Sequence, residues 1–482
     1  MATSYHLSVS VAASGRSGIA RAGIAAAIAI ATFGAALSTA PLQVAMSGVV
    51  LALIILLLWR QNDPPILLLP ALFQWSEVAI VPISTIWKRG VLNDLSRLGA
   101  NLEASTVYGL LGVISLAAGM HFALGRRRGL TQQLINEARA LEFGIVARLA
   151  FALMGAGYAS AVISSIAGPA RELFNNASNI KYVGLFILTH WCLARRSYMH
   201  ILVAVVGFDI IFGMTSFFAD FKSAMLTLLV AALVARPRLK PSDVGVVALA
   251  TSLLLTVAIF WSAIKQDYRL YMNEGTGAQV VLVPLGERLY YLTSEASKFA
   301  ADDFARGFDA LVSRHGYIDY LARTMETVPD LFPYENGALT AAVVQHITAP
   351  RFLFPDKPPL PSDTEVMARY TDQVFVWSEN TSISIGHLAE LYVDFGYMGG
   401  LCGMIMIGLG LGTVYRAILA YRSTPAFLAS GLCLMTVLPA ADFGIAYAKL
   451  VGAVVFCSAI AIVFQRVGAP LLLKALHVRA RL

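Results

Sequence analysis

The stretch LQVAMSGVVLALIILLLW, residues Leu42 to Trp59, contains no charged side chain. A bilayer core about 30 Å thick is crossed by about 20 apolar residues in a helix, so this stretch predicts a membrane span. Eleven further stretches resemble it, and the twelve expected spans are 18–39, 42–59, 65–86, 104–124, 144–167, 181–195, 197–217, 220–235, 243–264, 387–417, 424–442 and 446–465. With 57% apolar and 13% charged residues, the chain is expected to be an all-α polytopic membrane protein.

The spans divide the chain into five parts. Residues 1–16 are rich in Ser, Ala and Gly and are expected to form a disordered tail, and residues 17–264 hold nine helices. Residues 265–385 form one polar insert of about 120 residues, after which 386–466 hold three helices and 467–482 a basic tail. The stretch Gly18 to Ala40 is too long for a signal peptide and leads almost directly into the next apolar segment, so we take it as the first membrane helix.

The orientation of the chain follows from its basic connections, because Lys and Arg stay on the cytoplasmic side. Basic residues fall on alternate sides of the expected spans: Arg60, Arg126, Arg127, Arg128, Arg195, Arg196, Arg236, Arg238, Lys240, Arg416, Arg422, Arg466, Lys474, Arg479 and Arg481. Both termini are therefore expected in the cytoplasm and the insert outside. Lys88, Arg89 and Arg97 fall on the wrong side, which makes the third span the least secure and suggests that it is tilted or re-entrant.

The charge distribution agrees with this orientation. From Lys265 to Glu379 there are 10 basic and 16 acidic residues, which leaves 26 basic and 13 acidic residues for the rest of the chain. The excess of positive charge therefore serves membrane orientation and contact with anionic lipid. Nucleic-acid binding is not expected.

The insert has an internal organisation. Residues 285–328 carry apolar side chains at helical spacing, and two prolines, Pro329 and Pro333, end that pattern. A short helix is expected over 339–347, followed by a stiff segment with four prolines between 355 and 363. All four cysteines lie in expected spans, so the insert offers no disulfide framework.

Outside the insert, Gly399, Gly403, Gly408 and Gly412 recur at about four-residue spacing, which predicts close helix packing in the tenth span.

Two motifs resemble a known family. The first runs from Gly337 through Gln345 to APRFLFPDKP at 349–358, and the second is LAELYVDFGYMGG at 388–400. Together they resemble the Wzy-type polymerases of O-antigen and exopolysaccharide repeat units, most strongly over 337–413. Phe221-Lys222-Ser223-Ala224 adds weaker support, since members often carry a basic residue before small residues in the helix two spans before the large loop.

The resemblance implies a GT-C-like, metal-independent glycosyltransferase of the bacterial inner membrane, without cofactors. Such enzymes transfer a growing glycan from undecaprenyl diphosphate to the non-reducing end of a new lipid-linked repeat unit on the periplasmic face, with inversion if the displacement is single. The implied partners are the lipid-linked glycan, the bilayer, a chain-length regulator and a flippase. Sugar identity and chain length are not encoded in any motif.

The chemistry of that reaction selects the candidate residues. A departing diphosphate needs fixed cations, and a sugar hydroxyl needs a carboxylate or histidine to take its proton. The catalytic candidates are Glu390, His387, Arg351 and Lys357. The substrate-binding candidates are Arg269, Arg288, Lys222, Asp356, His346 and Asp394. No metal ligands are expected.

Each candidate has a structural alternative. Lys222 could pair with Asp209 or Asp220, Glu390 could form a salt bridge, and Arg269 and Arg288 could be interfacial. Glu77 is expected in a buried pair, and Asp442 is expected to pair with Lys449 across a short connection.

Two other functions also remain open. A ligase would use the same lipid donor with a different acceptor, whereas a transporter would be expected to have two related halves and short loops.

Overall fold

The computed structural model describes residues 18–60, 63–125, 129–216, 221–235, 241–276, 280–349, 351, 353–354, 356–357, 359–373, 383–421 and 423–476. For residues 241–251 it describes the backbone alone. The N-terminal tail, part of the Pro-rich segment, Asp220 and several basic residues used for orientation lie outside these ranges, including 126–128, 236–240, 422 and 477–482.

Every regular element in the described ranges is a helix. The first helix covers Gly18–Leu37 and ends in η1 (Ile30–Gly34) and α2 (Ala35–Leu37). The other apolar helices are α3 (Pro41–Leu58), α4 (Leu68–Lys88), α5 (Leu102–Leu124), α7 (Phe143–Ser164), α9 (Ile180–Arg195), α10 (Met199–Met214), α11 (Phe221–Ala235), α12 (Pro241–Met272), α18 (His387–Ala420), α19 (Ala426–Val437) and α20 (Tyr447–Val463). Each expected span therefore coincides with a helix.

Seven of these helices are long and apolar enough to cross a bilayer: Gly18–Leu37, α3, α4, α5, α7, α18, and Tyr447–Ala475, in which α20 continues through η5 (Phe464–Gly468) into α21 (Ala469–Ala475). Helices α9, α10, α11 and the α19–η4 segment Ala426–Ala441 are apolar but shorter than 18 residues. The fold is thus compatible with a multi-pass membrane protein. Helix α4, the expected third span, is continuous over 21 residues despite Pro82.

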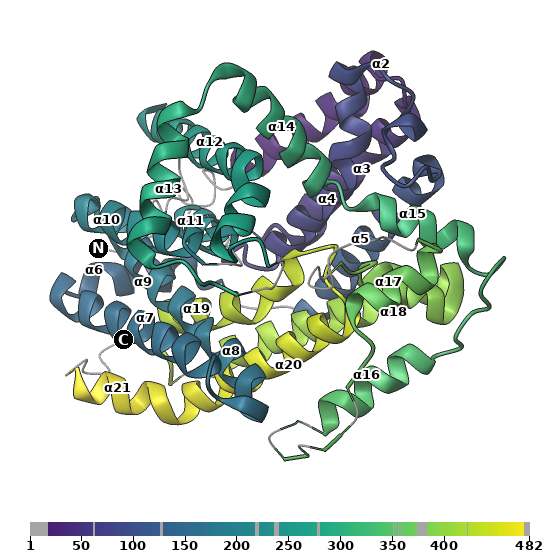
Figure 1. Cartoon of the computed structure of the whole chain (residues 1–482). Coiled ribbons are helices and arrows are strands. Elements are labelled where there is room, and N and C mark those ends of the chain that lie inside the picture. Colours follow the sequence, from purple (N-terminus) through teal and green to yellow (C-terminus); the bar gives the residue numbers. More distant parts are fainter. Residues whose placement is uncertain are drawn as a thin grey trace.

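The described part of the insert beyond α12 contains the helices α13 (Leu285–Lys298), α14 (Ala301–His315), α15 (Ile318–Thr327), α16 (Ala338–Thr348) and α17 (Asp363–Thr371). The helices expected within 285–328 and over 339–347 are present. Figure 1 shows α13 and α14 beside α12, whereas α15, α16 and α17 lie towards α18. Shorter helices complete the chain: η2 (Leu92–Leu95), α6 (Thr131–Ala140), η3 (Gly168–Ala170), α8 (Arg171–Ser178) and η4 (Leu438–Ala441).

The core is organised around α5 and α18, which share the most extensive helix contact. Two glycines of the expected stripe make this possible. A Cβ at Gly408 would lie 2.2 Å from the Leu116 carbonyl oxygen, and one at Gly412 would lie 2.6 Å from the Ala123 Cβ. Gly399 and Gly403 do not meet α5; they line a cavity on the other side of α18. The prediction of close packing is right for the second pair of glycines and wrong for the first pair.

Helix α18 is broken at Gly396. Its φ of 68° and ψ of −167° are not helical, and a side chain there would be strained. The segment before the break, 387–395, holds His387, Glu390 and Asp394, all of them buried. The Phe-Gly pair of the second motif therefore ends one short helix and allows the next to leave at a different angle.

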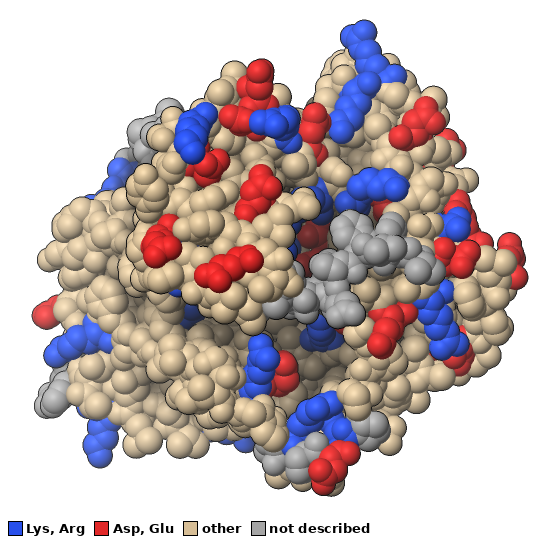
Figure 2. Space-filling view, in the orientation of Figure 1, with Lys and Arg blue, Asp and Glu red and all other residues tan. Residues whose placement is uncertain are grey.

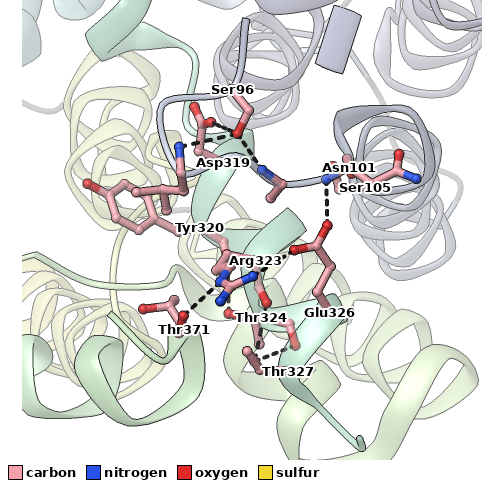
Figure 3. Close-up of polar contacts among 12 residues, drawn as sticks. Ser96, Asn101, Ser105, Asp319, Tyr320, Arg323, Thr324, Glu326, Thr327 and Thr371 are labelled. Carbon is pink, nitrogen blue, oxygen red and sulfur yellow. Dashed lines mark hydrogen bonds and ion pairs between the residues drawn. The ribbon is translucent and has the colours of Figure 1, made fainter. Parts of the chain in front are cut away.

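The insert is anchored to the connection between α4 and α5. Asp319 of α15 is buried and accepts hydrogen bonds from Ser96 Oγ and the Arg97 backbone N–H, both at 2.8 Å, while Arg97 Nε lies 3.1 Å from its second oxygen. Figure 3 shows α15 between this connection and α17, with Glu326 accepting from the Asn101 backbone N–H at 2.7 Å.

These contacts explain the basic residues that conflict with the expected orientation. Lys88 forms an ion pair with Asp309 of α14 at 3.4 Å, and Arg97 pairs with Asp319. Both cations therefore lie on the side of the insert, where acidic residues of the insert neutralise them.

Candidate functional site

The connection between η4 and α20, Asp442 to Ala446, lies at the meeting point of segments that are far apart in the sequence. Glu77 of α4 accepts a hydrogen bond from the Phe443 backbone N–H at 2.5 Å. Gln74, one turn earlier, donates to the Ala440 carbonyl oxygen at 2.7 Å. On the insert side, Tyr317 packs so closely on Gly444 that a Cβ there would lie 2.6 Å from its ring. We call Asp442 to Ala446 the junction loop.

Lys222 lies at the centre of a charged cluster beside the junction loop. Its ammonium is 3.3 Å from Glu77 Oε1 and 3.5 Å from Asp442 Oδ2, and it lies 3.9 Å from the centre of the Phe73 ring. Glu77 is buried, whereas 49% of the Asp442 side chain is exposed. Glu77 therefore holds the lysine from the protein interior, whereas the Asp442 carboxylate is accessible from solvent.

His315, the last residue of α14, brings the insert into this cluster. Its Nε2 lies 2.8 Å from Ser76 Oγ, and its ring packs edge-on against Phe73 at 5.0 Å. Burial, followed by the positive charge of Lys222, lowers the pKa of His315 to about 4, and Asp442 opposes this shift more weakly. At neutral pH the ring is therefore uncharged, so one ring nitrogen is a hydrogen-bond donor and the other an acceptor.

A group of cations continues from His315 along the insert. The next residue back, Arg314, has its pKa lowered by burial and by Arg97. Helix α12 is 32 residues long, about 48 Å, so its last two turns extend beyond the expected span 243–264. In these turns, burial and then the positive charges of Arg314 and Arg269 lower the pKa of Lys265 to about 7. Burial and then the charge of Arg314 lower the pKa of Arg269 to about 10. These cations repel one another, and carboxylates line the cavity beside them.

Two cavities adjoin these elements. Arg314 borders a polar cavity of about 390 Å³ between α12, α13 and α14, which also contains Asp267, Glu295 and Lys298. A larger apolar cavity of about 830 Å³ lies between α18 and α20. Figure 2 shows that the face of the molecule is hollowed near its centre, with Lys or Arg and Asp or Glu side chains at the wall of the hollow.

Glu390 and His387 are buried next to the junction loop. Glu390 is 8% exposed, and its Oε1 accepts from the Tyr447 backbone N–H at 3.1 Å. His387 is fully buried, and its ring lies 5.9 Å from that of Phe443. The structure thus brings these two candidates and Lys222 to one loop, although both side chains of α18 are more enclosed than Asp442.

Asp394 caps a helix of the insert. Its carboxylate accepts from the backbone N–H groups of Leu339 and Thr340 at 3.0 and 2.7 Å, and from Thr340 Oγ1 at 2.6 Å. These groups belong to the first turn of α16, where a carboxylate is favoured by the helix dipole. The second motif therefore docks the insert on α18, and Tyr392 contributes a hydrogen bond to the Val328 carbonyl oxygen at 2.8 Å.

Arg351 and Lys357 form a separate pair of cations near His346, at the far end of α16. Lys357 donates to the His346 carbonyl oxygen at 2.7 Å, which ties the Pro-rich segment back to the helix. Burial and Arg351 lower the pKa of Lys357, and burial, Lys357 and then Arg351 lower that of His346. Asp356 is exposed between them, and Pro350, Phe352, Pro355 and Pro358 of the motif lie outside the described residues. The structure does not bring this group to the junction loop.

The other substrate-binding candidates divide. Arg269 joins the cations around Arg314, as described above. Arg288 donates to the Thr215 carbonyl oxygen and so connects the start of α13 to the end of α10. Lys222 does not pair with Asp209, which pairs with Lys181 at 3.7 Å, and Asp220 lies outside the described residues.

Sequence reasoning missed much of the cluster. Asp442 was expected to pair with Lys449, which is wrong: Asp442 pairs with Lys222, and Lys449 pairs with Asp363 at 2.5 Å. His315, Arg314 and Arg97 lie in no motif. The available signal for the cluster is Glu77, which lies within an expected membrane span and has no basic partner nearby in its own helix. Such a charge requires a partner from another helix.

No protein-family model, curated protein or solved structure matches the chain. Among the described residues, no group of three or more His, Cys, Asp or Glu side chains is placed to hold a metal ion.

Proposed function

We propose that the protein is a glycosyltransferase that polymerises lipid-diphosphate-linked oligosaccharides. The observation that carries the proposal is the charged cluster at the junction loop, where an accessible carboxylate, Asp442, forms an ion pair with Lys222 of α11 beside His315 of the insert. Transfer from a lipid diphosphate needs both kinds of group in one place, and it needs them where the lipid headgroup meets the membrane helices. The motif resemblance over 337–413 narrows the reaction to polymerisation.

In the proposed reaction, a hydroxyl of the incoming repeat unit attacks the anomeric carbon of the growing chain. The new glycosidic C–O bond forms as the bond between that carbon and the diphosphate oxygen breaks, and the hydroxyl proton passes to the Asp442 carboxylate. The departing diphosphate carries away the bonding electron pair, and Arg314, Lys265 and Arg269 stabilise its charge. Lys222 holds Asp442 in position through its 3.5 Å ion pair.

The candidates from the motifs take different roles in this proposal. Glu390 and His387 support the junction loop from behind and act as positioning residues. Arg351 and Lys357 lie at the end of α16 and contact the donor away from the reacting atoms. Asp394 is left out of substrate binding, because three donors of α16 already surround its carboxylate.

The test is incubation of the purified protein with a synthetic lipid-diphosphate repeat unit, without metal or nucleotide sugar, followed by separation of the products by size. We expect a ladder of lipid-linked oligomers that is lost in Asp442→Asn and strongly reduced in Arg314→Ala. Asp302→Asn on α14 and Arg171→Ala on α8 change exposed side chains of the same types and should leave the ladder intact.

The alternatives predict other outcomes. A ligase would leave the repeat unit unchanged until a different acceptor, such as lipid A core, is added. A transporter would give no covalent product with either acceptor. An intact ladder in Asp442→Asn would refute the role of the junction loop, and an intact ladder in both Arg351→Ala and Lys357→Ala would refute a donor contact at α16.

A further inference from the structure

The start of α13 and the residues before it expose large apolar side chains in one short stretch. We call residues 280–290, with the sequence VVLVPLGERLY, the apolar segment. Five of its side chains are at least 39% exposed: Val280, Val281, Leu282, Leu285 and Tyr290. Single exposed apolar residues are ordinary on a protein surface, whereas a group of neighbours marks an interaction site.

The exposed surface of α13 changes in character after Tyr290. In the later turns of this helix the exposed residues are small or polar: Thr293, Ala296, Ser297 and Lys298. Large exposed apolar side chains of α13 are therefore confined to its beginning. Removal of this end from water would be favourable, whereas the other end gains nothing from it.

Two hydrogen bonds hold the apolar segment at the ends of apolar helices. Arg288 donates to the carbonyl oxygen of Thr215, the residue that follows α10. The Leu282 backbone N–H donates at 2.9 Å to the carbonyl oxygen of Met272, the last residue of α12. Helix α10 itself exposes large apolar side chains in its last two turns: Phe208, Ile211 and Phe212. The start of α13 thus lies within one side-chain length of the end of an exposed apolar helix.

Tyrosine and tryptophan side chains gather around these contacts. Tyr291 of α13 stacks on Tyr271 of α12 with ring centres 4.6 Å apart, and its ring centre lies 5.5 Å from that of Tyr268. Tyr268 packs edge-on against Trp261 at 5.7 Å. Tyr and Trp are enriched where membrane helices leave the hydrocarbon, because their rings are apolar and their tips are polar. The aromatic group therefore indicates a membrane–water interface beside the apolar segment.

We propose that the apolar segment inserts into the boundary between headgroups and acyl chains of the bilayer, on the side of the membrane where the insert lies. Apolar surfaces that lie in this boundary reach about 5–10 Å into it, a depth that side chains of this size can cover. Five side chains are far fewer than the about 20–30 residues that each partner contributes to a stable protein interface, which favours lipid as the occupant. Docking here would fix one wall of the polar cavity, because α13 contributes Glu295 and Lys298 to it. The inference does not depend on the proposed reaction.

The test places a bimane fluorophore on single cysteines of the full-length protein in nanodiscs, with Cys402→Ser to remove the exposed native thiol. Leu285→Cys and Tyr290→Cys report on the apolar segment, and Ser297→Cys is the matched control because Ser297 is exposed on the same helix. Fluorescence is compared between phosphatidylcholine and the same lipid brominated in its acyl chains, and then with iodide added to the water. Brominated lipid should remove most of the fluorescence at 285 and 290 and leave that at 297 unchanged, whereas iodide should quench chiefly at 297.

Three results would overturn the inference. Iodide quenching at 285 and 290 as strong as at 297 would place the segment in water. Protection of both positions from both quenchers would assign the surface to a second copy of the chain. In the Leu285→Cys protein, Val281→Ser together with Leu282→Ser should restore part of the fluorescence in brominated lipid, because less apolar area is left to insert. Quenching as strong as before would mean that the fluorophore alone enters the bilayer.

Discussion

At the scale of single residues, Lys222 has the most consequential surroundings. It neutralises Glu77, which is buried in a helix that is apolar enough to cross a membrane, and it also holds Asp442. Removing one partner of a buried ion pair leaves the other charge without compensation, which costs more than removing both partners. Substitutions can therefore separate the structural role of Lys222 from its proposed role in catalysis.

We expect Lys222→Met to destabilise the protein by about 3 kcal/mol, because the Glu77 carboxylate loses its ion pair. The double variant Lys222→Met/Glu77→Gln should regain most of the thermal unfolding temperature in detergent but little of the oligomer yield. Lys181→Met, which breaks the ion pair with Asp209 away from the junction loop, is the control for nonspecific loss. Full recovery of yield in the double variant would show that Lys222 acts on stability alone.

His315 predicts a dependence of stability on pH. Its pKa is lowered from 6.5 to about 4 in the folded state, so between these values the unfolded chain binds a proton that the folded protein does not. Stability should therefore fall as the pH drops from 6.5 towards 4, by at most about 3 kcal/mol. Thermal unfolding across this range would measure the effect. His315→Gln places a side-chain amide, which does not titrate, near Ser76 and should flatten the curve. An equally steep curve would mean that other groups cause the pH dependence.

At the scale of elements, the break in α18 determines how the insert meets the membrane helices. Gly396 adopts a positive φ, and its Cα lies close enough to Tyr334 that a Cβ would be 3.3 Å from the ring. The helix on one side carries Glu390 and Asp394, and the helix on the other side lines the apolar cavity. The break therefore separates the buried polar segment 387–395 from the apolar remainder of α18.

Gly396→Ala should destabilise the protein by about 1–3 kcal/mol, because an L-residue is strained at this φ and ψ. Gly452→Ala in α20 is helical with nothing within 4 Å, and should be neutral or slightly stabilising. Thermal unfolding of the two variants in the same detergent makes the comparison. Equal unfolding temperatures would mean that the chain at 396 can straighten without loss.

The capping of α16 by Asp394 gives a second prediction at this scale. Asp394→Ala removes three hydrogen bonds at the start of the helix and should cost about 1–2 kcal/mol. Hydrogen exchange should rise at the amides of Leu339 and Thr340 and along α16, while α14 stays protected. Unchanged exchange in α16 would indicate that its packing on α18 and α20 is sufficient.

At the scale of the whole molecule, sequence patterns predicted the helices far better than the site. Apolar stretches locate the apolar helices of the described residues, because hydropathy depends on nearby residues alone. The partners of Glu77 cannot be located in this way, since they come from α11 and from the junction loop. The Asp394 motif was visible, but its helix-capping role depends on where α16 packs.

The ion pairs of Lys88 and Arg97 predict that the α4–α5 connection lies on the same side of the membrane as the insert. In intact cells or sealed vesicles, Lys88→Cys and Asp330→Cys should react with a membrane-impermeant maleimide from one side. Arg139→Cys in α6 should react from the other side. Cys192, Cys433 and Cys457 are buried, whereas Cys402 is exposed, so all variants also carry Cys402→Ser to keep the background low. Labelling of Lys88→Cys and Arg139→Cys from the same side would contradict this arrangement.

The hydrogen bond between Glu77 and the junction loop also has a consequence for biosynthesis. Glu77 is separated from Lys222 by 145 residues and from the Phe443 N–H by 366 residues. At about 5–20 residues per second, a ribosome needs about 20–70 s to supply that last donor. During this interval the nascent chain holds an incompletely solvated carboxylate in the bilayer, which is costly. A chain that stalls before the junction loop can form the Lys222 ion pair but leaves the Glu77 carboxylate without its Phe443 hydrogen bond.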